Sequence, residues 1–262
     1  MVTRSKGKLG VEEQHTTLLM FGELTVDFIA IDRWLVPLRM VKTPHELTIL
    51  RRNFALTDIG HTAARAATMP GKREIDVWLE IYSAISQVAG YPVRLGNDCV
   101  VGYRQDNVGG APQEYLIRPG DSLTVDLSTV DRGYWSDSCM TYYAGERSFR
   151  QQQVHDTVRR ALELGISLVK PGVAVNSIDR TLREFMARHG LPGYPHHTGH
   201  GVGVSGHEEP RITPYNETLL QPGMVIMLEP GAYFPGELSV RIEDGILVTD
   251  SGAEVLTTHS KL

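Results

Sequence analysis

The segment HTGHGVGVSGHEEP, residues 197–210, combines two patterns that point to different chemistry. Its glycines fit G-x-G-x-x-G, the dinucleotide-binding fingerprint, but they also lie between His200 and His207 and precede two glutamates, as in a metal site. A pyrophosphate needs a helix N-terminus directly after the glycines, and Pro210 and Pro214 disfavour a helix there. The sequence therefore favours a metal site over a nucleotide site.

Two further pairs of acids have a spacing that suits such a site. Asp126 and Asp137 lie on either side of Asp131-Arg132-Gly133, which is typical of a hairpin turn. Antiparallel pairing across this turn would bring the two aspartates close together. Glu229 in VIMLEPG and Glu243 in SVRIEDG have a similar arrangement, across a hairpin expected near residues 234–236.

An internal repeat relates the two pairs of acids at an offset near 100 residues. Residues 69–126 match residues 170–229, and Asp126 and Glu229 fall at equivalent places inside apolar runs. The matching turn and helix signals are Met69-Pro70-Gly71 with Lys170-Pro171-Gly172, Ile75-Asp76 with Ile178-Asp179, Gly90-Tyr91-Pro92 with Gly193-Tyr194-Pro195, and Arg118-Pro119-Gly120 with Gln221-Pro222-Gly223. We infer two related halves that face each other, each with an acid on an inner strand.

Carboxylates that converge in an interior raise each other's pKa and destabilise the fold unless a cation compensates them. A single acid near a turn is usually a surface group, and Asp131 and Asp244 keep that interpretation. Asp126 and Glu229 differ because an unpaired charge inside an apolar run is costly. Four carboxylates with the imidazole of His200 suit divalent Mn, Co, Fe or Zn rather than a sulfur-rich structural zinc site.

The elements that must position these side chains alternate helices with strands in each half. Helices are expected from the capping box at Thr43 to about residue 69, over 74–88, from Ser148 to about 170, and from an Asn176 cap to just before Gly190. Strands are expected over 121–128, 133–143, 223–230 and 239–249. This order predicts an α+β fold with helices outside a mostly antiparallel sheet.

The composition is that of a globular protein and excludes several partner classes. The 262 residues, with 41% hydrophobic and 22% charged residues, allow one large domain or two small ones. The net charge of −5 and the lack of a Lys/Arg run argue against nucleic acid and acidic membranes as partners. We find no signal peptide or membrane-spanning run, and two isolated cysteines suit a reducing cytoplasm.

Residues 40–260 resemble the metallopeptidase family of methionine aminopeptidases, prolidases and Xaa-Pro aminopeptidases. The resemblance is carried by VDLSTVDRGYWSD, GHGVGVSGHEEP, MLEPG and RIED. It implies the pita-bread fold, two pseudo-symmetric halves with a curved antiparallel sheet covered by outer helices. It also implies two divalent metal ions, Mn²⁺ first and Co²⁺, Zn²⁺ or Fe²⁺ as alternatives, with Asp137 and Glu243 bridging. The implied ligands are Asp126, Asp137, His200, Glu229 and Glu243.

The resemblance also assigns catalytic roles. The stretches YPHHTGHGVG, LEPGAY and VRIEDG are similar to the prolidase and Xaa-Pro aminopeptidase branch, which implies hydrolysis of Xaa-Pro peptides or dipeptides. Water activated by the metals would attack the amide, and Glu229 would carry a proton to the leaving nitrogen. His207 would stabilise the oxyanion, and His196 and Arg241 would lie near the substrate. Glycines at 199, 201 and 203 would let the backbone pass close to the metals.

Residues 6–45 resemble the end of the N-terminal domain of that branch. We therefore expect residues 1–42 to be the remnant or tail of a creatinase/prolidase-type domain and residues 43–262 to form the catalytic domain. The rest of the N-terminal domain is absent from this sequence, so the chain is expected to be either naturally short or derived from a longer protein. A homodimer is a further expectation from the resemblance.

One departure from the family concerns the first half. The family usually carries a histidine in a loop before the first aspartate ligand, but this sequence has none between His61 and His155. Gly102 or a neighbour falls at that position, and Asn97 is the repeat mate of His200. Two alternatives therefore stay open, a C–N hydrolase acting on a small non-peptide amide and a non-catalytic binding module. The complete set of five ligands disfavours the binding module.

Overall fold

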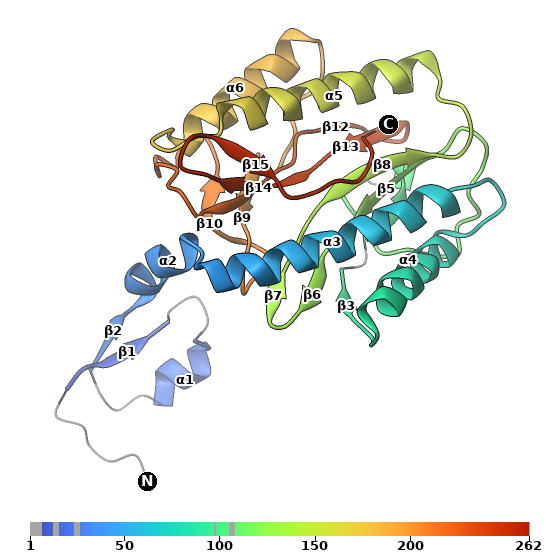
Figure 1. Cartoon of the computed structure of the whole chain (residues 1–262). Coiled ribbons are helices and arrows are strands. Elements are labelled where there is room, and N and C mark those ends of the chain that lie inside the picture. The colour runs from blue at the N-terminus through green and yellow to red at the C-terminus, as the bar shows by residue number, and fades with distance from the viewer. Residues whose placement is uncertain (1–6, 13–15, 24–26, 97, 105–107, 262) are drawn as a thin grey trace.

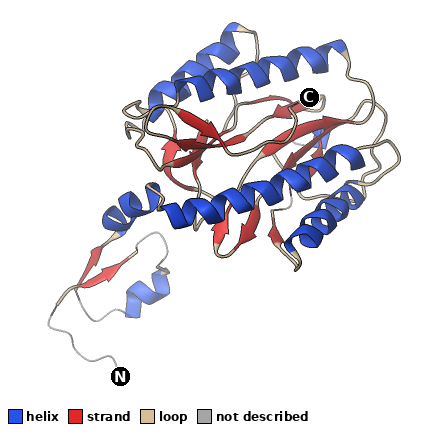
Figure 2. Cartoon of the chain, viewed as in Figure 1, coloured by secondary structure: helices blue, strands red, loops and turns tan. Residues whose placement is uncertain are grey.

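The computed structural model describes residues 7–12, 16–23, 27–96, 98–104 and 108–261. Two pairs of long helices enclose the strands from opposite sides, and the N-terminal elements project from one end (Figures 1 and 2). The helices are α1 (Leu18–Glu23), α2 (Asp32–Met40), α3 (Pro44–Ala67), α4 (Glu74–Ala89), the 3₁₀ helix η1 (Gly102–Arg104), α5 (Phe149–Leu168) and α6 (Val175–Arg188). None of the helices in these described ranges is long and apolar enough to cross a membrane.

The strands form several small, mostly antiparallel sheets. They are β1 (Leu9–Val11), β2 (Phe28–Ala30), β3 (Arg94–Leu95), β4 (Asp98–Val101), β5 (Ser122–Asp126), β6 (Thr129–Asp131), β7 (Tyr134–Trp135), β8 (Cys139–Tyr143), β9 (Gly199–Gly201), β10 (Glu208–Ile212), β11 (Val225–Leu228), β12 (Gly231–Phe234), β13 (Leu238–Arg241), β14 (Asp244–Val248) and β15 (Ala253–Val255). The sheet orders are β4-β5-β8 and β3-β6-β7 in the first half and β10-β9-β11-β14-β15 and β12-β13 in the second. The short parallel pair β1-β2 belongs to the N-terminal segment.

Local capping signals start and end the helices of the first half as expected. The hydroxyl of Thr43 accepts the N–H of Glu46, whose carboxylate accepts the N–H of Thr43 in return, and Pro44 occupies the first turn of α3. Gly90 ends α4 with φ of 82°, a left-handed conformation that glycine adopts without strain. Helices α3 and α4 pack side by side and cover one face of the first-half strands (Figure 1).

The second half repeats this construction with one difference from expectation. Ser148 and Gln151 form the capping box of α5, as predicted. Asn176 was expected to cap α6, and this is wrong: the helix begins at Val175, and Asn176 lies inside it. A β-bridge between Ala174 and Leu219 keeps the chain extended up to Ala174, so the helix starts directly after that bridge.

The repeat inferred from the sequence is visible in the backbone. Gly71 and Gly172 both have positive φ, 89° and 82°, in the turns before α4 and α6. Their N–H groups donate to equivalent carbonyls, those of Ile117 and Leu220. The two halves therefore use the same glycine turn to fix the start of the second helix against the chain that leads into the inner strands.

Two predicted strands are each divided in the structure. The expected strand 133–143 separates into β7 and β8, and the expected strand 239–249 separates into β13 and β14. The reason is that β7 pairs with β6 whereas β8 pairs with β5, so the chain crosses from one sheet to another over residues 136–138. In the second half, β13 pairs with β12 whereas β14 pairs with β11, so the chain makes the same kind of crossing over residues 242–243. Asp137 and Glu243 lie at these crossings.

The two halves join along one seam. Cys139 and Glu243 form a β-bridge, in which the N–H of Glu243 donates to the carbonyl of Cys139 at 2.9 Å. The hydroxyl of Thr141 accepts the N–H of Arg241 at 3.1 Å and lies 3.3 Å from the carbonyl of the same residue. Strand β13 therefore packs across β5 and β8, and the main buried apolar cluster contains residues of both halves.

Candidate metal centre

The structure brings the five predicted ligands to one place. Asp126 ends β5, His200 lies in β9, and Glu229 follows β11 directly. Asp137 and Glu243 lie at the two points where the chain crosses between sheets. All five line a cavity of about 210 Å³, with His207, Gly96, Asp98 and Ser128 completing its wall. The two aspartates lie together, as the turn at residues 131–133 predicts, because β5 pairs with β8 and sets Asp126 opposite Cys139, two residues after Asp137, and both aspartates line the cavity.

His200 presents one ring nitrogen to the acids of the site. Its Nδ1 lies 2.9 Å from the carbonyl of Gly201, which can only accept, so Nδ1 carries the proton. Burial lowers the pKa of His200 to about 3, so the ring is neutral and Nε2 has a free lone pair. That Nε2 lies 3.9 Å from an oxygen of Asp137, 3.7 Å from one of Glu229 and 3.6 Å from one of Glu243. This is the tautomer and orientation of a metal-binding histidine.

Asp137 and Glu243 show the strain expected of converging acids, whereas Glu229 does not. Burial raises the pKa of Glu229, but the close contact with His197 and the charge of protonated His200 outweigh burial and lower this pKa to about 2. Burial, followed by the negative charge of Asp126, raises the pKa of Asp137 well above its ordinary value. Burial and then the charges of Asp137, Asp126 and Glu229 raise the pKa of Glu243 in the same way. Among the described residues, Glu229 Oε1 and Glu243 Oε1 are buried without a hydrogen-bond partner. Buried, unpartnered carboxylate oxygens next to a free imidazole nitrogen fit a divalent cation.

One cation of the protein already contacts the acids. Arg241, only 4% exposed, donates from Nη2 to Asp126 at 2.5 Å and from Nη1 to the carbonyl of Val108 at 2.7 Å and the hydroxyl of Tyr233 at 3.1 Å. Its guanidinium therefore lies behind Asp126 and is not part of the cavity wall. In this position it orients the carboxylate of Asp126, and its predicted contact with substrate stays a prediction.

His196 and His207 line two different hollows beside the predicted ligands. His207 lines the cavity, and its ring lies 4.0 Å from that of His200, centroid to centroid. Burial and the charge of Arg211 lower the pKa of His207, so it is a neutral donor near pH 7. His196 accepts a hydrogen bond from the hydroxyl of Tyr233 at 2.8 Å, and its Nδ1 lies 3.6 Å from Glu229. His196 lines a second hollow of about 520 Å³ next to the ligand group.

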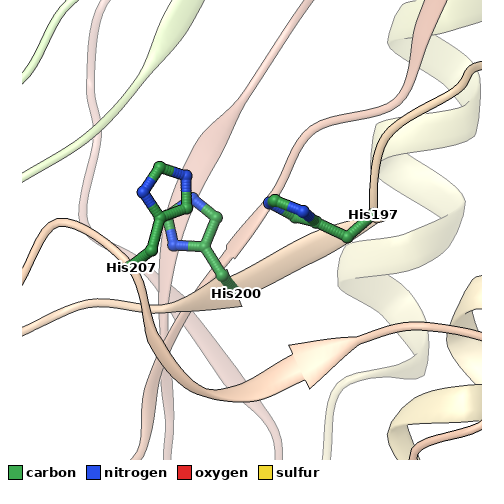
Figure 3. A group of neighbouring side chains, drawn as sticks. All are labelled: His197, His200 and His207. Carbon is green, nitrogen blue, oxygen red and sulfur yellow. The ribbon is translucent and has the colours of Figure 1, made fainter. Parts of the chain in front are cut away.

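Sequence reasoning missed two side chains of the site. Nε2 of His197 lies 3.0 Å from Oε1 of Glu229, and its ring packs near those of His200 and His207 (Figure 3). The only signal was its position beside His196. Asp98 lines the cavity because antiparallel pairing of β4 with β5 sets it opposite Asp126. Burial and the charge of Asp126 raise the pKa of Asp98.

The first-half loop was expected to be unusual because it has no histidine. Gly102, the expected position of the missing side chain, lies at the junction of the halves, where its carbonyl accepts from Ser239. Gly102 is not among the residues that line the cavity, whereas Gly96 and Asp98 are. Asn97, the expected repeat mate of His200, lies outside the described residues.

The glycines on either side of His200 have a packing role that was not expected from the sequence. The segment after them forms strand β10 and no helix, in agreement with the rejection of a nucleotide site. A Cβ on Gly199 would overlap the carbonyl of Met227, and one on Gly201 would overlap that of Glu209. These glycines therefore let β9 lie close to its neighbouring strands, which in turn fixes the position of His200.

A buried ion-pair network holds the loop that carries His207. The carboxylate of Glu208 accepts hydrogen bonds from Arg39 of α2, from Lys42, and from the N–H of Ser205 at 3.0 Å. Arg39 also donates to the hydroxyl of Ser205 at 3.1 Å. The side chains of Glu208 and Lys42 are only 4% and 1% exposed. The end of α2 and the residues just after it are thus connected to the loop that carries His207.

Comparison with known proteins agrees with this geometry. The model of metallopeptidase family M24 matches residues 48–250. The chain is 33% identical over 232 residues to the Xaa-Pro dipeptidase of Pyrococcus furiosus and 32% identical over 235 residues to the putative dipeptidase YkvY of Bacillus subtilis. It is 38% identical over 223 residues to the probable dipeptidase PepE of Mycobacterium tuberculosis. These alignments cover 88%, 89% and 82% of this chain, and it spans only 67%, 65% and 58% of the lengths of those relatives.

Solved structures confirm the pita-bread fold. The prolidase from Pyrococcus horikoshii OT3 superposes with a TM-score of 0.91 at 30% identity, over 97% of this chain and 74% of that one. The X-Pro aminopeptidase from Thermotoga maritima superposes with a TM-score of 0.89 at 25% identity, over 97% and 73%. With a family model matching most of its length and the family's fold, the chain belongs to metallopeptidase family M24.

Proposed function

We propose that this chain carries out the metal-dependent hydrolysis of Xaa-Pro dipeptides or peptides, as an enzyme of the prolidase and aminopeptidase P type. The observation that carries the proposal is the convergence of five donor side chains from both halves on one cavity, with two buried carboxylate oxygens that accept no hydrogen bond from the described residues. The names of the relatives, Xaa-Pro dipeptidase and dipeptidase, support the same substrate class.

The five converging side chains suit two divalent cations, and Mn²⁺ is the metal that we expect first. Asp126, Asp137, His200, Glu229 and Glu243 would hold them, Asp137 and Glu243 contributing to both. Bound divalent cations would polarise the amide carbonyl and lower the pKa of an attacking water.

The side chains around the metals would complete the reaction. Glu229 faces the cavity and would transfer the proton from the water to the leaving nitrogen. His207, a neutral donor on the cavity wall, would hydrogen-bond the developing oxyanion. Arg241 fixes the carboxylate of Asp126, and His196 lies at the hollow where a peptide would approach.

The domain boundary and the setting of the enzyme are part of the same proposal. Residues 1–42 would be the tail of an N-terminal domain, and residues 43–262 the catalytic domain. A cytoplasmic location and a homodimer complete the proposal, with the two buried free cysteines consistent with reducing surroundings.

The test is hydrolysis of Xaa-Pro dipeptides and longer Xaa-Pro peptides by the metal-stripped chain, with and without added Mn²⁺. Asp137→Asn should reduce turnover by more than about 100-fold, because loss of even an indirect metal contact costs 10- to 100-fold. The same variant should raise the stability of the metal-free protein, because it removes one of the crowded charges. Metal-loaded protein that cleaves no Xaa-Pro bond would refute the proposal, and turnover of a small non-peptide amide would then support the C–N hydrolase alternative.

A further inference from the structure

His197 is an imidazole in the site that the family's five ligands do not include. Its side chain is 24% exposed, yet its Nε2 is a buried atom without a hydrogen-bond partner in the described part of the chain. The nearest polar atom is Oε1 of Glu229 at 3.0 Å, which also has no such partner. The two atoms form a close ion pair without hydrogen-bond geometry, and a cation beside the pair, bonded to both at about 2.1 Å with an angle near 90°, would hold them at about this separation.

The position of His197 relative to the other donors is compatible with one shared cation. In Figure 3 its ring points toward those of His200 and His207. Donor nitrogens of the three rings lie within 4.8 Å of one another. The rings of His197 and His200 are 5.3 Å apart and nearly perpendicular, at 86°. Two imidazoles bound to one tetrahedral zinc, with Zn–N bonds near 2.0 Å, place their ring centres about 5 Å apart.

The carboxylates of Glu229 and Glu243 lie close enough to these imidazoles to bind the same cation. Glu229 Oε1 lies 3.0 Å from Nε2 of His197 and 3.7 Å from Nε2 of His200, and the latter lies 3.6 Å from Glu243 Oε1. Two ligands of one cation, each bonded at 2.0–2.2 Å, are at most about 4.3 Å apart. Each of the three measured separations is below that limit. Three of the four donor atoms are buried without a hydrogen-bond partner among the described residues, and one cation would bind all of them.

We propose that His197 is an additional ligand of the cation that binds His200, Glu229 and Glu243. This inference rests on the proposed metal-dependent function. With the shared carboxylate of Asp137, the cation would then have two imidazoles and three carboxylates, and the second imidazole favours Zn²⁺ or Co²⁺ over Mn²⁺. The cation on the side of Asp126 and Asp137 would keep an oxygen-rich environment suited to Mn²⁺. The two positions of the site would therefore differ in metal preference.

His207 is a weaker candidate for the same role. Its ring lies 4.0 Å from that of His200 with an interplanar angle of 39°, which is close to a stacking arrangement. The two rings are therefore closer together than about 5 Å, the spacing of two imidazoles on one zinc. His207 is also the more exposed side chain of the three. It remains free to donate a hydrogen bond to substrate.

The experiment measures metal affinity in the full chain and needs no substrate. Metal-stripped wild type, His197→Asn and a control, His189→Asn, are titrated separately with Zn²⁺ and Mn²⁺ in competition with a chromophoric chelator. His189 is an exposed histidine at the end of α6, so its replacement should leave both affinities unchanged. His197→Asn should weaken the tighter Zn²⁺ site at least tenfold and change Mn²⁺ affinity by less than threefold. The visible spectrum of the Co²⁺-loaded protein should change as well, because one nitrogen ligand is lost.

The outcomes separate this inference from the proposed function. Unchanged Zn²⁺ affinity in His197→Asn, or equal weakening for both metals, overturns the assignment of His197 even if the enzyme cleaves Xaa-Pro peptides. Selective loss of Zn²⁺ affinity upholds the assignment even if no Xaa-Pro peptide is cleaved. Circular dichroism of each variant verifies that the fold is retained. A wild type that binds neither metal overturns both proposals.

Discussion

Replacement of Glu208 by glutamine tests how strongly the N-terminal segment holds the loop over the cavity. The Glu208→Gln variant keeps the size of the side chain but removes its charge. One carboxylate oxygen accepts from Arg39 and from the N–H of Ser205, and the other lies 3.3 Å from Nζ of Lys42. If the amide oxygen of the glutamine accepts the hydrogen bonds from Arg39 and Ser205, its NH₂ group faces the ammonium of Lys42. Two donors then oppose each other in a buried position.

The expected cost follows from the burial of the pair. Removing one partner of a buried ion pair typically costs 3–5 kcal/mol, because the remaining charge stays in the interior. Lys42 retains the carbonyl of Arg39 at 2.8 Å and that of Met40 at 3.4 Å, and burial lowers its pKa, so it can lose its proton more easily than an exposed lysine. We therefore expect the lower end of this range, a loss of about 3 kcal/mol.

The assay is equilibrium unfolding in urea of four metal-free proteins: wild type, Glu208→Gln, Lys42→Met and the double variant. The double variant should lose at least about 1 kcal/mol less than the sum of the single variants, because it leaves no unpaired ammonium. Glu208→Gln should also lower kcat, since the loop of His207 is less firmly held. A cost below about 1 kcal/mol for Glu208→Gln, or strictly additive costs, would refute the reasoning.

Two further predictions concern the packing of β9 and the C-terminal end. Gly199→Ala should destabilise the protein by about 3 kcal/mol and weaken metal binding, since its Cβ would overlap a rigid carbonyl beside His200. The control Gly193→Ala, which places its Cβ in open space, should change the free energy of unfolding in urea by less than about 0.5 kcal/mol. Burial raises the pKa of Asp58, but hydrogen bonds from His259 and the residue before it outweigh burial and lower it. Asp58→Asn should therefore destabilise above about pH 5 and lose its effect as the pH falls toward 3; an effect that grows in acid would contradict this.

The predicted ligands could be identified from the sequence because each signal is local or repeated. Asp126 and Glu229 interrupt apolar runs, and the repeat then points to Asp137 and Glu243. The helices were predictable for a similar reason, since capping residues act over three or four positions. The divided strands were not, because the point at which a chain crosses between sheets depends on partners distant in sequence.

The side chains that the sequence did not reveal depend on contacts between distant segments. Asp98 enters the site only through the register of β4 against β5. Lys42 and Glu208 pair across 166 positions. His197 could have been suspected from its neighbours, but only the orientation of its ring shows that it faces Glu229 rather than solvent.

The seam between Cys139 and Glu243 has a mechanical consequence. Two of the predicted ligands come from the first half and three from the second, and they meet at the junction where Cys139 hydrogen-bonds to Glu243 and the side chain of Thr141 hydrogen-bonds to the backbone of Arg241. A bound cation would therefore act as a crosslink between the halves as well as a catalyst. Loss of the metals would leave mutually repelling acids at the joint, so the same charges that attract the cations would push the halves apart when the cations leave.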